Sequence, residues 1–125
     1  MHICTITAAP AKPYKSVKTL AEDPAMMIYT SGTTGSPKGV LHAHRFLLGH
    51  LPCLDLSFED FPNNTNTDVG WTPADWAWIG GLMDIAMPCF YYRVPLVAKR
   101  FDRFTAQAAF ELIRDAKVSL SLCLS

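Results

Sequence analysis

The sequence predicts an α/β fold in which helices cover a mostly parallel sheet. From Val69 onward, short apolar runs alternate with longer helical patterns in the order strand, helix, strand, helix, strand. This alternation is typical of a parallel sheet with helices on both faces. Half of the 125 residues are hydrophobic and 18% are charged, which supplies enough apolar surface for a core and excludes disorder of the highly charged kind.

The first half of the chain predicts two strands and a short helix on either side of a glycine-rich loop. The expected elements are a buried strand at 25–31, a second strand at 39–44, one or two helical turns at 45–51 that end at Pro52, and an exposed loop at 60–68.

The second half carries the regular alternation. The expected elements are strands at 69–72, 94–98 and 118–124, with helices at 75–91 and 105–117 between them. The helix at 105–117 is amphipathic. Its apolar face is expected to hold Ala106, Ala109, Phe110 and Ile113, and its polar face Gln107, Glu111, Arg114 and Asp115.

The domain organisation is inferred from where the regular pattern begins and from the strand edges that it leaves without a partner. Residues 1–22 have no sustained period and are interpreted as a lead-in segment, and residues 23–125 as an incomplete domain. A parallel sheet with an outer strand at 118–124 and a separate strand pair before Pro52 has open edges. We therefore expect the chain to be part of a larger α/β domain.

Charge and cysteine usage exclude several classes of function. Eleven basic and eleven acidic residues cancel, so there is no bulk electrostatic argument for binding nucleic acid. The four cysteines lie far apart without a C-x-x-C pair, which argues against a structural zinc site, and His42 and His44 lack a third ligand at a suitable spacing. The apolar runs are shorter than the ~18 residues of a membrane span. We expect a cytoplasmic protein without a bound metal.

The stretch "YTSGTTGSPKGV", residues 29–40, predicts a phosphate-binding loop. Glycines allow backbone N–H groups to approach phosphate oxygens, the hydroxyl side chains add donors, and Lys38 adds positive charge. Pro37 restricts the loop just before that lysine. The alternative is an ordinary surface turn. The candidate phosphate ligands are Thr30, Ser31, Gly32, Thr33, Thr34, Gly35 and Lys38.

The same stretch resembles the phosphate-binding signature of the adenylate-forming (AMP-binding) enzymes at twelve consecutive positions. It differs from the Walker A loop because Lys38 lies between Pro37 and Gly39. The later stretch "DVGWTPADWAWIGGL" has the W-x-x-x-D-x-x-W-I spacing of the acetyl and medium-chain acyl-CoA synthetases, and the resemblance covers about residues 23–118.

The resemblance implies a two-step ligase reaction. ATP, with Mg²⁺, and a small carboxylic acid give an acyl-adenylate and pyrophosphate, and coenzyme A then displaces AMP to give the thioester. The loop would hold the β- and γ-phosphates of ATP. Asp75 and Trp78 are candidates for the acyl pocket, together with Trp71 and Trp76, although such aromatic side chains can equally pack a helix onto the sheet.

The family's adenine, ribose and C-terminal lysine motifs have no counterpart in these 125 residues. We therefore expect no turnover by the chain alone, and the sequence leaves open whether it acts as an enzyme. An alternative is a non-catalytic truncated product that associates with a full-length synthetase through its uncovered apolar edge. A P-loop phosphotransferase ranks last, because a Walker-type lysine context is missing. The acid and the oligomeric state are left open.

Overall fold

The computed structural model describes residues 15–31, 35–58, 61–62 and 67–122. The chain divides into two compact units, residues 1–46 and residues 47–125. Each unit is described by itself below. Whether a domain begins at residue 23 stays a prediction.

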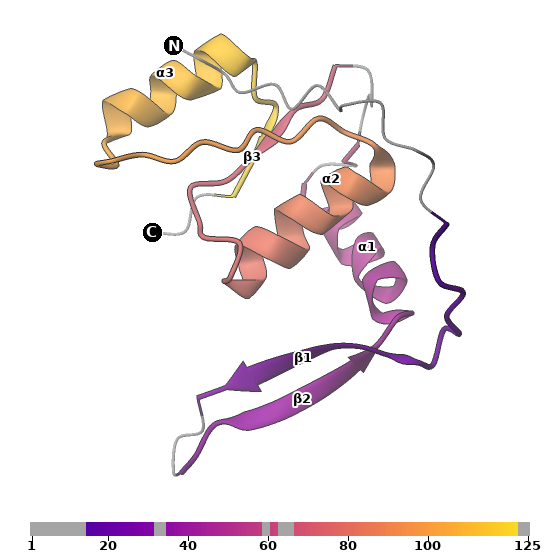
Figure 1. The fold of residues 1–125 in the computed structure, drawn as a ribbon. Helices are drawn as coiled ribbons and strands as arrows, with labels where there is room; N and C mark the ends of the chain where they lie inside the picture. Colours follow the sequence, from indigo (N-terminus) through magenta and orange to yellow (C-terminus); the bar gives the residue numbers. More distant parts are fainter. Residues whose placement is uncertain (1–14, 32–34, 59–60, 63–66, 123–125) are drawn as a thin grey trace. The chain divides into compact units, whose positions relative to one another are not determined.

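The first unit contains a two-stranded antiparallel ribbon, drawn in indigo and magenta in Figure 1. Strand β1 (Pro24–Thr30) pairs with β2 (Lys38–Ala43), so that Met27 lies opposite Leu41. The register is irregular only between Pro24 and Met26. Both strands form close to their predicted positions, because β-branched and long apolar side chains precede and follow the turn-forming loop.

The prediction that residues 25–31 form a buried strand is wrong. Within β1 only Met26 and Ile28 are half-buried, while Met27 is 50% and Tyr29 67% exposed. Successive side chains of a strand point to opposite faces, and the described residues of this unit provide no second layer to cover either face. An isolated two-stranded ribbon has little stability by itself, so packing must be supplied from outside the ribbon.

Helix α1 (Phe46–Ser57) contains Pro52 in its interior, so the prediction that the helix ends there is wrong. Proline removes one helical hydrogen bond and costs about 3 kcal/mol in a helix interior. Burial of Leu51 and Leu54 offsets this cost, since each buried leucine side chain contributes about 1.5–3 kcal/mol. The N–H of Phe58 also donates to the carbonyl of Leu54 at 2.8 Å, which continues the helical pattern beyond the proline.

The next helix begins later than predicted. Residues 76–78 form a turn and a bend, in which the Ala77 N–H donates to Asp75 Oδ1 at 2.8 Å and the Trp78 N–H donates to the Asp75 carbonyl at 2.9 Å. A π-helix η1 (Gly80–Ala86) then runs into α2 (Met87–Tyr92). The wider turns of the π-helix precede Pro88. Proline has no N–H, so it cannot donate the regular helical hydrogen bond to the carbonyl of Asp84.

Two polar contacts join α1 to this second helix, one on each side of Pro52. His50 Nε2 and Asp84 Oδ1 lie 2.8 Å apart, and the Tyr92 hydroxyl donates to Asp55 Oδ1 at 3.3 Å. Burial, followed by the negative charge of Asp55, raises the pKa of Tyr92 above its ordinary value. These contacts hold both halves of α1 against the same helix and further offset the cost of the proline.

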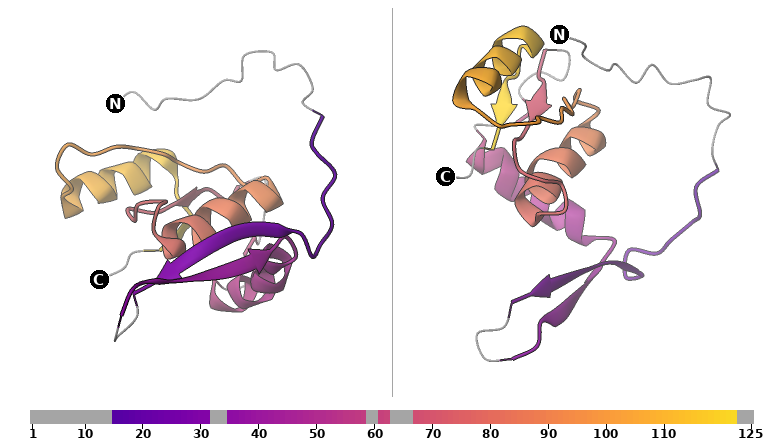
Figure 2. Two further views of the ribbon diagram at one scale, coloured as in Figure 1. Left: turned by 60° about the horizontal axis from the view of Figure 1, so that its bottom comes forward. Right: turned by 60° about the vertical axis from the view of Figure 1, so that its left-hand side comes forward.

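A small parallel sheet forms the centre of the second unit, as predicted. Strand β3 (Gly70–Trp71) pairs in parallel with β4 (Leu120–Ser121), and Figure 2 shows the two arrows side by side. Gly70 also forms a single parallel bridge with Leu96, so the described part of the predicted strand 94–98 contributes one pairing only. The predicted strand 118–124 shortens to two described residues, and its last two positions lie outside the described residues.

Helix α3 (Ala106–Ala116) lies within its predicted bounds. The Thr105 hydroxyl accepts the Ala108 N–H at 3.2 Å and caps the start, and Lys117 ends the helix with a φ of 53°. The expected apolar face is partly wrong, because Ala106 is exposed and Phe110 is 70% exposed. Leu112 lies in the core instead, since the helix presents Ala109 and Leu112 to Trp71.

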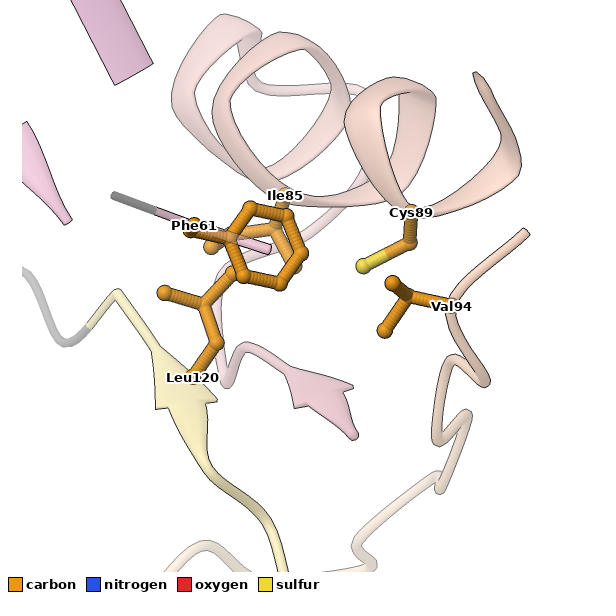
Figure 3. Packing of buried hydrophobic residues seen from close by; sticks show 5 residues of the cluster. All are labelled: Phe61, Ile85, Cys89, Val94 and Leu120. Carbon is orange, nitrogen blue, oxygen red and sulfur yellow. The ribbon is translucent and has the colours of Figure 1, made fainter. Parts of the chain in front are cut away.

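The larger apolar cluster lies between α2 and the sheet. Figure 3 shows its five members, Phe61, Ile85, Cys89, Val94 and Leu120. Phe61 was expected in an exposed loop but is 4% exposed, because its ring packs in this cluster and meets the ring of Tyr92 edge-on at 6.2 Å. One aromatic side chain thus anchors a segment whose composition otherwise predicts a surface turn.

Among the described residues, every helix is too short or too polar to cross a lipid bilayer.

Candidate functional site

The predicted phosphate loop joins the two strands of the ribbon. Thr30 ends β1 and Lys38 begins β2, and the two residues are paired in the register. The Thr30 hydroxyl donates to the carbonyl of Lys38 at 3.4 Å, which closes the base of the loop. Ser31 is exposed, and Gly32, Thr33 and Thr34 lie outside the described residues. The ribbon therefore holds the two ends of the loop together in an exposed position.

The two glycines that follow have different surroundings. A Cβ atom on Gly39 would lie 2.8 Å from Met27 Sδ and 3.3 Å from Tyr29 Cε1, so a side chain there would displace the exposed side chain of Met27. A Cβ atom on Gly35 would meet no described atom within 4 Å. Packing of the described residues therefore gives no reason for Gly35. Access of a ligand to the backbone N–H groups does give one.

The charge at this loop comes from Lys38. Its side chain is exposed, and none of the ion pairs among the described residues involves it. An exposed ammonium that takes part in none of these ion pairs is suited to a phosphate. His42, on the same strand, packs its ring 4.8 Å from the ring of Phe46. Within the part of the chain that the structure describes, no three His, Cys, Asp or Glu side chains gather in a way that could hold a metal ion.

A cavity of about 750 Å³ lies in the second unit. Residues 72–76, residues 97–101 and Phe104 line it. The first of these segments follows β3 and the second follows the bridge at Leu96, so both leave the carboxyl ends of parallel strands. Open α/β sheets characteristically bind ligands at that edge.

Hydrogen bonds and one close approach of the backbone hold residues 72–76 in place. The buried Thr72 hydroxyl donates to the Leu122 carbonyl at 2.9 Å and accepts the Ala74 N–H at 3.1 Å. A Cβ atom on Gly81 would lie 2.7 Å from the Asp75 carbonyl oxygen, so only glycine lets the helix start this close to the segment. The cavity wall is thus fixed by the residue that follows β4 and by η1.

The opposite wall is aromatic and basic. Phe101 and Phe104 meet edge-on with ring centroids 5.6 Å apart, and Phe101 also packs against Trp71 at 6.3 Å. The Lys99 ammonium lies 4.9 Å from the centroid of the Phe101 ring, a cation–π distance. Arg100 lies next to it, exposed, at the cavity. The cavity therefore combines apolar rings with positive charge.

The residues predicted for the acyl pocket have different surroundings in the structure. Asp75 lines the cavity, and so does Trp76. Trp78 is 61% exposed and is not among the lining residues, and Trp71 is buried in the core at 1% exposure. The sequence prediction omitted Phe101 and Phe104. A signal was present, because the stretch "KRFDRF" places aromatic and basic side chains directly after a predicted strand.

The chain matches the profile of the AMP-binding enzyme family over residues 4–124. It is 31% identical over 120 residues to an uncharacterized acyl-CoA ligase, YtcI, of Bacillus subtilis (strain 168), an alignment that covers 92% of this chain and 21% of that protein. It is 43% identical over 72 residues to an acetyl-coenzyme A synthetase of Leptospira biflexa serovar Patoc. This alignment covers 58% of this chain and 10% of that protein. The chain spans about a fifth or less of the length of these relatives.

Solved structures share the fold. A complex described as McyG A-PCP with phenylalanyl-adenylate has a TM-score of 0.69 at 23% identity, covering 90% of this chain and 17% of that one. The apo structure of MatB from Rhodopseudomonas palustris has a TM-score of 0.66 at 22% identity, and the match covers 87% of this chain and 20% of that one. These similarities confirm the predicted fold class. Relatives named acyl-CoA ligase and acetyl-coenzyme A synthetase are similar to it over part of their length. Because the family profile matches nearly the whole of this chain, the chain belongs to the AMP-binding enzymes.

Proposed function

We propose that this chain carries the phosphate loop and part of the acid pocket of an ATP-dependent acyl-CoA synthetase. In that reaction a carboxylate oxygen attacks the α-phosphorus of ATP, and the bond to pyrophosphate breaks. The sulfur of coenzyme A then attacks the acyl carbon, the bond to AMP breaks, and the thiol proton is released. Mg²⁺ would arrive with the phosphates of the nucleotide, since magnesium in such sites is held largely by substrate oxygens.

The observation that supports this proposal best is that the loop has open space beside a glycine and carries the positive charge of a lysine. Gly35 is open to approach from outside, and the Lys38 ammonium has no partner in the described ion pairs. Ser31 is exposed at the same end of β1, whereas the Thr30 hydroxyl already donates to the Lys38 carbonyl. Donors that are already in position stabilise the negative charge of a leaving pyrophosphate without reorganising at the moment of reaction. Gly32, Thr33 and Thr34 belong to this proposed loop by sequence.

The cavity at residues 72–76 is the proposed site of the acid. Asp75, which the sequence suggested for the acid pocket, lines this cavity. The role proposed for Trp78 passes to Trp76, because Trp76 lines the cavity and Trp78 does not. Apolar walls with a few polar groups are characteristic of small-molecule sites. The proposed partners are therefore a nucleotide, a small carboxylic acid and coenzyme A.

A second candidate function is association with a full-length synthetase. The observation that favours it is the exposed apolar surface of the ribbon, where Tyr29 is 67% and Leu41 57% exposed. Exposed apolar patches often mark protein interfaces. We place either function in the cytoplasm, where the buried thiol of Cys89 would remain reduced.

Calorimetric titration of the chain with ATP and Mg²⁺ tests the phosphate loop. Binding is measured rather than turnover, because the chain spans only a fraction of its relatives. Lys38→Ala should weaken ATP binding about tenfold or more, since a charge-assisted hydrogen bond is lost. Gly35→Val should also weaken binding while leaving the fold intact, because its side chain enters open space.

Lys18→Ala is the matched control, since Lys18 is exposed and lies outside the loop. It should bind ATP like the parent chain. Equal ATP affinity in the parent, Lys38→Ala and Gly35→Val would refute the proposed phosphate site. For the second candidate, sedimentation of the chain mixed with a full-length acetyl-coenzyme A synthetase should show a joint species that Leu41→Asp abolishes.

A further inference from the structure

We infer that the acid taken by this cavity is an aromatic carboxylic acid rather than acetate. The inference rests on the proposed function, because it assumes that the cavity at residues 72–76 is the acid site. It follows from the size of the cavity, from the rings on its walls and from the position of its charges.

The cavity is open to solvent and is much larger than acetate needs. Its volume of about 750 Å³ lies within the range of about 300–1,000 Å³ that encloses drug-sized ligands. Acetate offers a single methyl group and would leave most of this space to water. An acid with a six-membered ring fills more of the space and removes more apolar surface from water, which is the main source of affinity in such a site.

Aromatic side chains stand on both walls. Trp76 comes from the segment after β3, and Phe101 and Phe104 come from the segment before α3. Trp76 is 37% and Phe104 54% exposed, so both keep apolar surface that a ligand can cover. Aromatic pairs at 4.5–7 Å gain energy beyond the area they bury. A ring held between these walls would make such contacts on more than one side.

Two cations on one wall of the cavity are placed to receive a carboxylate next to a ring, and the carboxylate of Asp75 lies on the other wall. Lys99 holds its ammonium 4.9 Å from the Phe101 ring centroid, so positive charge and aromatic surface lie side by side. Arg100 adds a second cation, and no ion pair among the described residues involves either side chain. An aromatic acid presents its own ring and carboxylate in the same close arrangement.

The other polar side chains of the cavity are at least partly engaged. The Thr72 hydroxyl uses its proton for the Leu122 carbonyl and accepts the Ala74 N–H. Asp75 accepts the Ala77 N–H with one carboxylate oxygen. Few groups therefore remain for the hydroxyls or amines of a more polar acid, and the site suits an unsubstituted aromatic ring best.

A ¹⁹F NMR titration of the full chain with 4-fluorobenzoate tests the inference. Binding should be saturable and reversed by benzoate, but not by the same concentration of acetate. Trp76→Ala and Phe104→Ala should each raise the Kd about threefold to tenfold. Lys99→Ala should also raise it. Trp78→Ala and Phe110→Ala, which remove exposed rings away from the cavity, should change it less than about twofold.

Each other outcome overturns the inference in a recognisable way. Displacement by acetate as effective as that by benzoate would keep the acid site and reject the aromatic preference. Displacement by AMP that is sensitive to Trp76→Ala and Phe104→Ala would assign the cavity to a nucleotide. Absence of 4-fluorobenzoate binding by a chain with helical circular dichroism and intact ATP binding would reject the acid site while the phosphate loop stands. Loss of ATP binding as well would reject the proposed function itself.

Discussion

The sulfur atom of Cys89 occupies the space in which a Cβ atom of Gly70 would lie. Gly70 is the centre of the small sheet, because it pairs with Leu120 on one side and bridges to Leu96 on the other. Cys89 projects from α2 onto this point and is fully buried. The helix can approach the sheet this closely only because the central residue has no side chain.

Gly70→Ala should therefore lower the free energy of unfolding by about 1–3 kcal/mol, the usual cost of overpacking a core. Leu96 Cδ1 and Ile85 Cγ2, at 3.6 and 3.8 Å from the added carbon, limit any relaxation. Urea unfolding followed by circular dichroism measures the change. Gly49→Ala is the control, since Gly49 lies on α1 with nothing within 4 Å and should gain up to about 1 kcal/mol. Combining Gly70→Ala with Cys89→Ala should restore part of the loss, and strict additivity would contradict the proposed overlap.

The stability of the chain should fall in alkaline solution because of Cys89. Burial, and then the negative charge of Asp68, raises the pKa of the Cys89 thiol from 9.0 to about 11. Between these values the folded thiol keeps its proton while the unfolded thiol releases it. The contribution is complete below pH 9 and is lost as the pH rises toward 11. Urea unfolding across this range should show a steeper decline for the parent chain than for Cys89→Ala. Parallel curves would rule out the shift.

The hydroxyl of Thr72 should hold the cavity wall against Leu122, the residue that follows β4. Thr72→Val leaves the Ala74 N–H and the Leu122 carbonyl without this partner, which should cost about 1–3 kcal/mol of unfolding free energy. Thr72→Ser keeps the hydroxyl and should cost only about 1 kcal/mol for the lost methyl group. Thermal unfolding of the two variants provides the comparison. A serine variant less stable than the valine variant would show that the methyl group, and not the hydrogen bonds, matters here.

Two adjacent glycines should respond differently to the same change. In Gly81→Ala the new carbon would lie 2.7 Å from the Asp75 carbonyl and 3.2 Å from that of Ala74, so the backbone of the cavity wall must move. In Gly80→Ala the nearest contacts are ordinary, at 3.4–3.5 Å. Gly81→Ala should lose about 1–3 kcal/mol of stability and shift the emission of Trp76, whereas Gly80→Ala should stay within about 1 kcal/mol of the parent. Equal behaviour in unfolding and fluorescence would disprove the close approach.

Local signals in the sequence predict elements well where neighbouring residues decide the structure. The helix expected at 105–117 has its boundaries set by a threonine cap and a left-handed lysine, both of which act within a few residues. Pro52 shows the limit of such rules. Its local preference is to end a helix, but burial of Leu51 and Leu54 and two polar contacts to the following helix outweigh it.

The candidate cavity shows why a site is harder to predict than a family. Residues 72–76 and 97–104 are separated by a whole helix, and only the parallel pairing of Gly70 with Leu96 brings the two segments to one edge. Periodicity reports which face of an element is apolar, but it carries no information about which ends of different strands meet. The sequence consequently did not indicate which residues lie across the cavity from Phe101 and Phe104.

By itself, the sequence determined the family and most of the order of the elements, and it supplied the residues of the proposed phosphate loop, because these depend on residue identity and short spacings. Only the tertiary structure decided that Trp76 rather than Trp78 faces the cavity, that Phe61 is buried and that Cys89 requires a glycine at position 70. Those outcomes depend on how closely elements distant in sequence pack, and close packing is a property of the assembled unit rather than of any one segment.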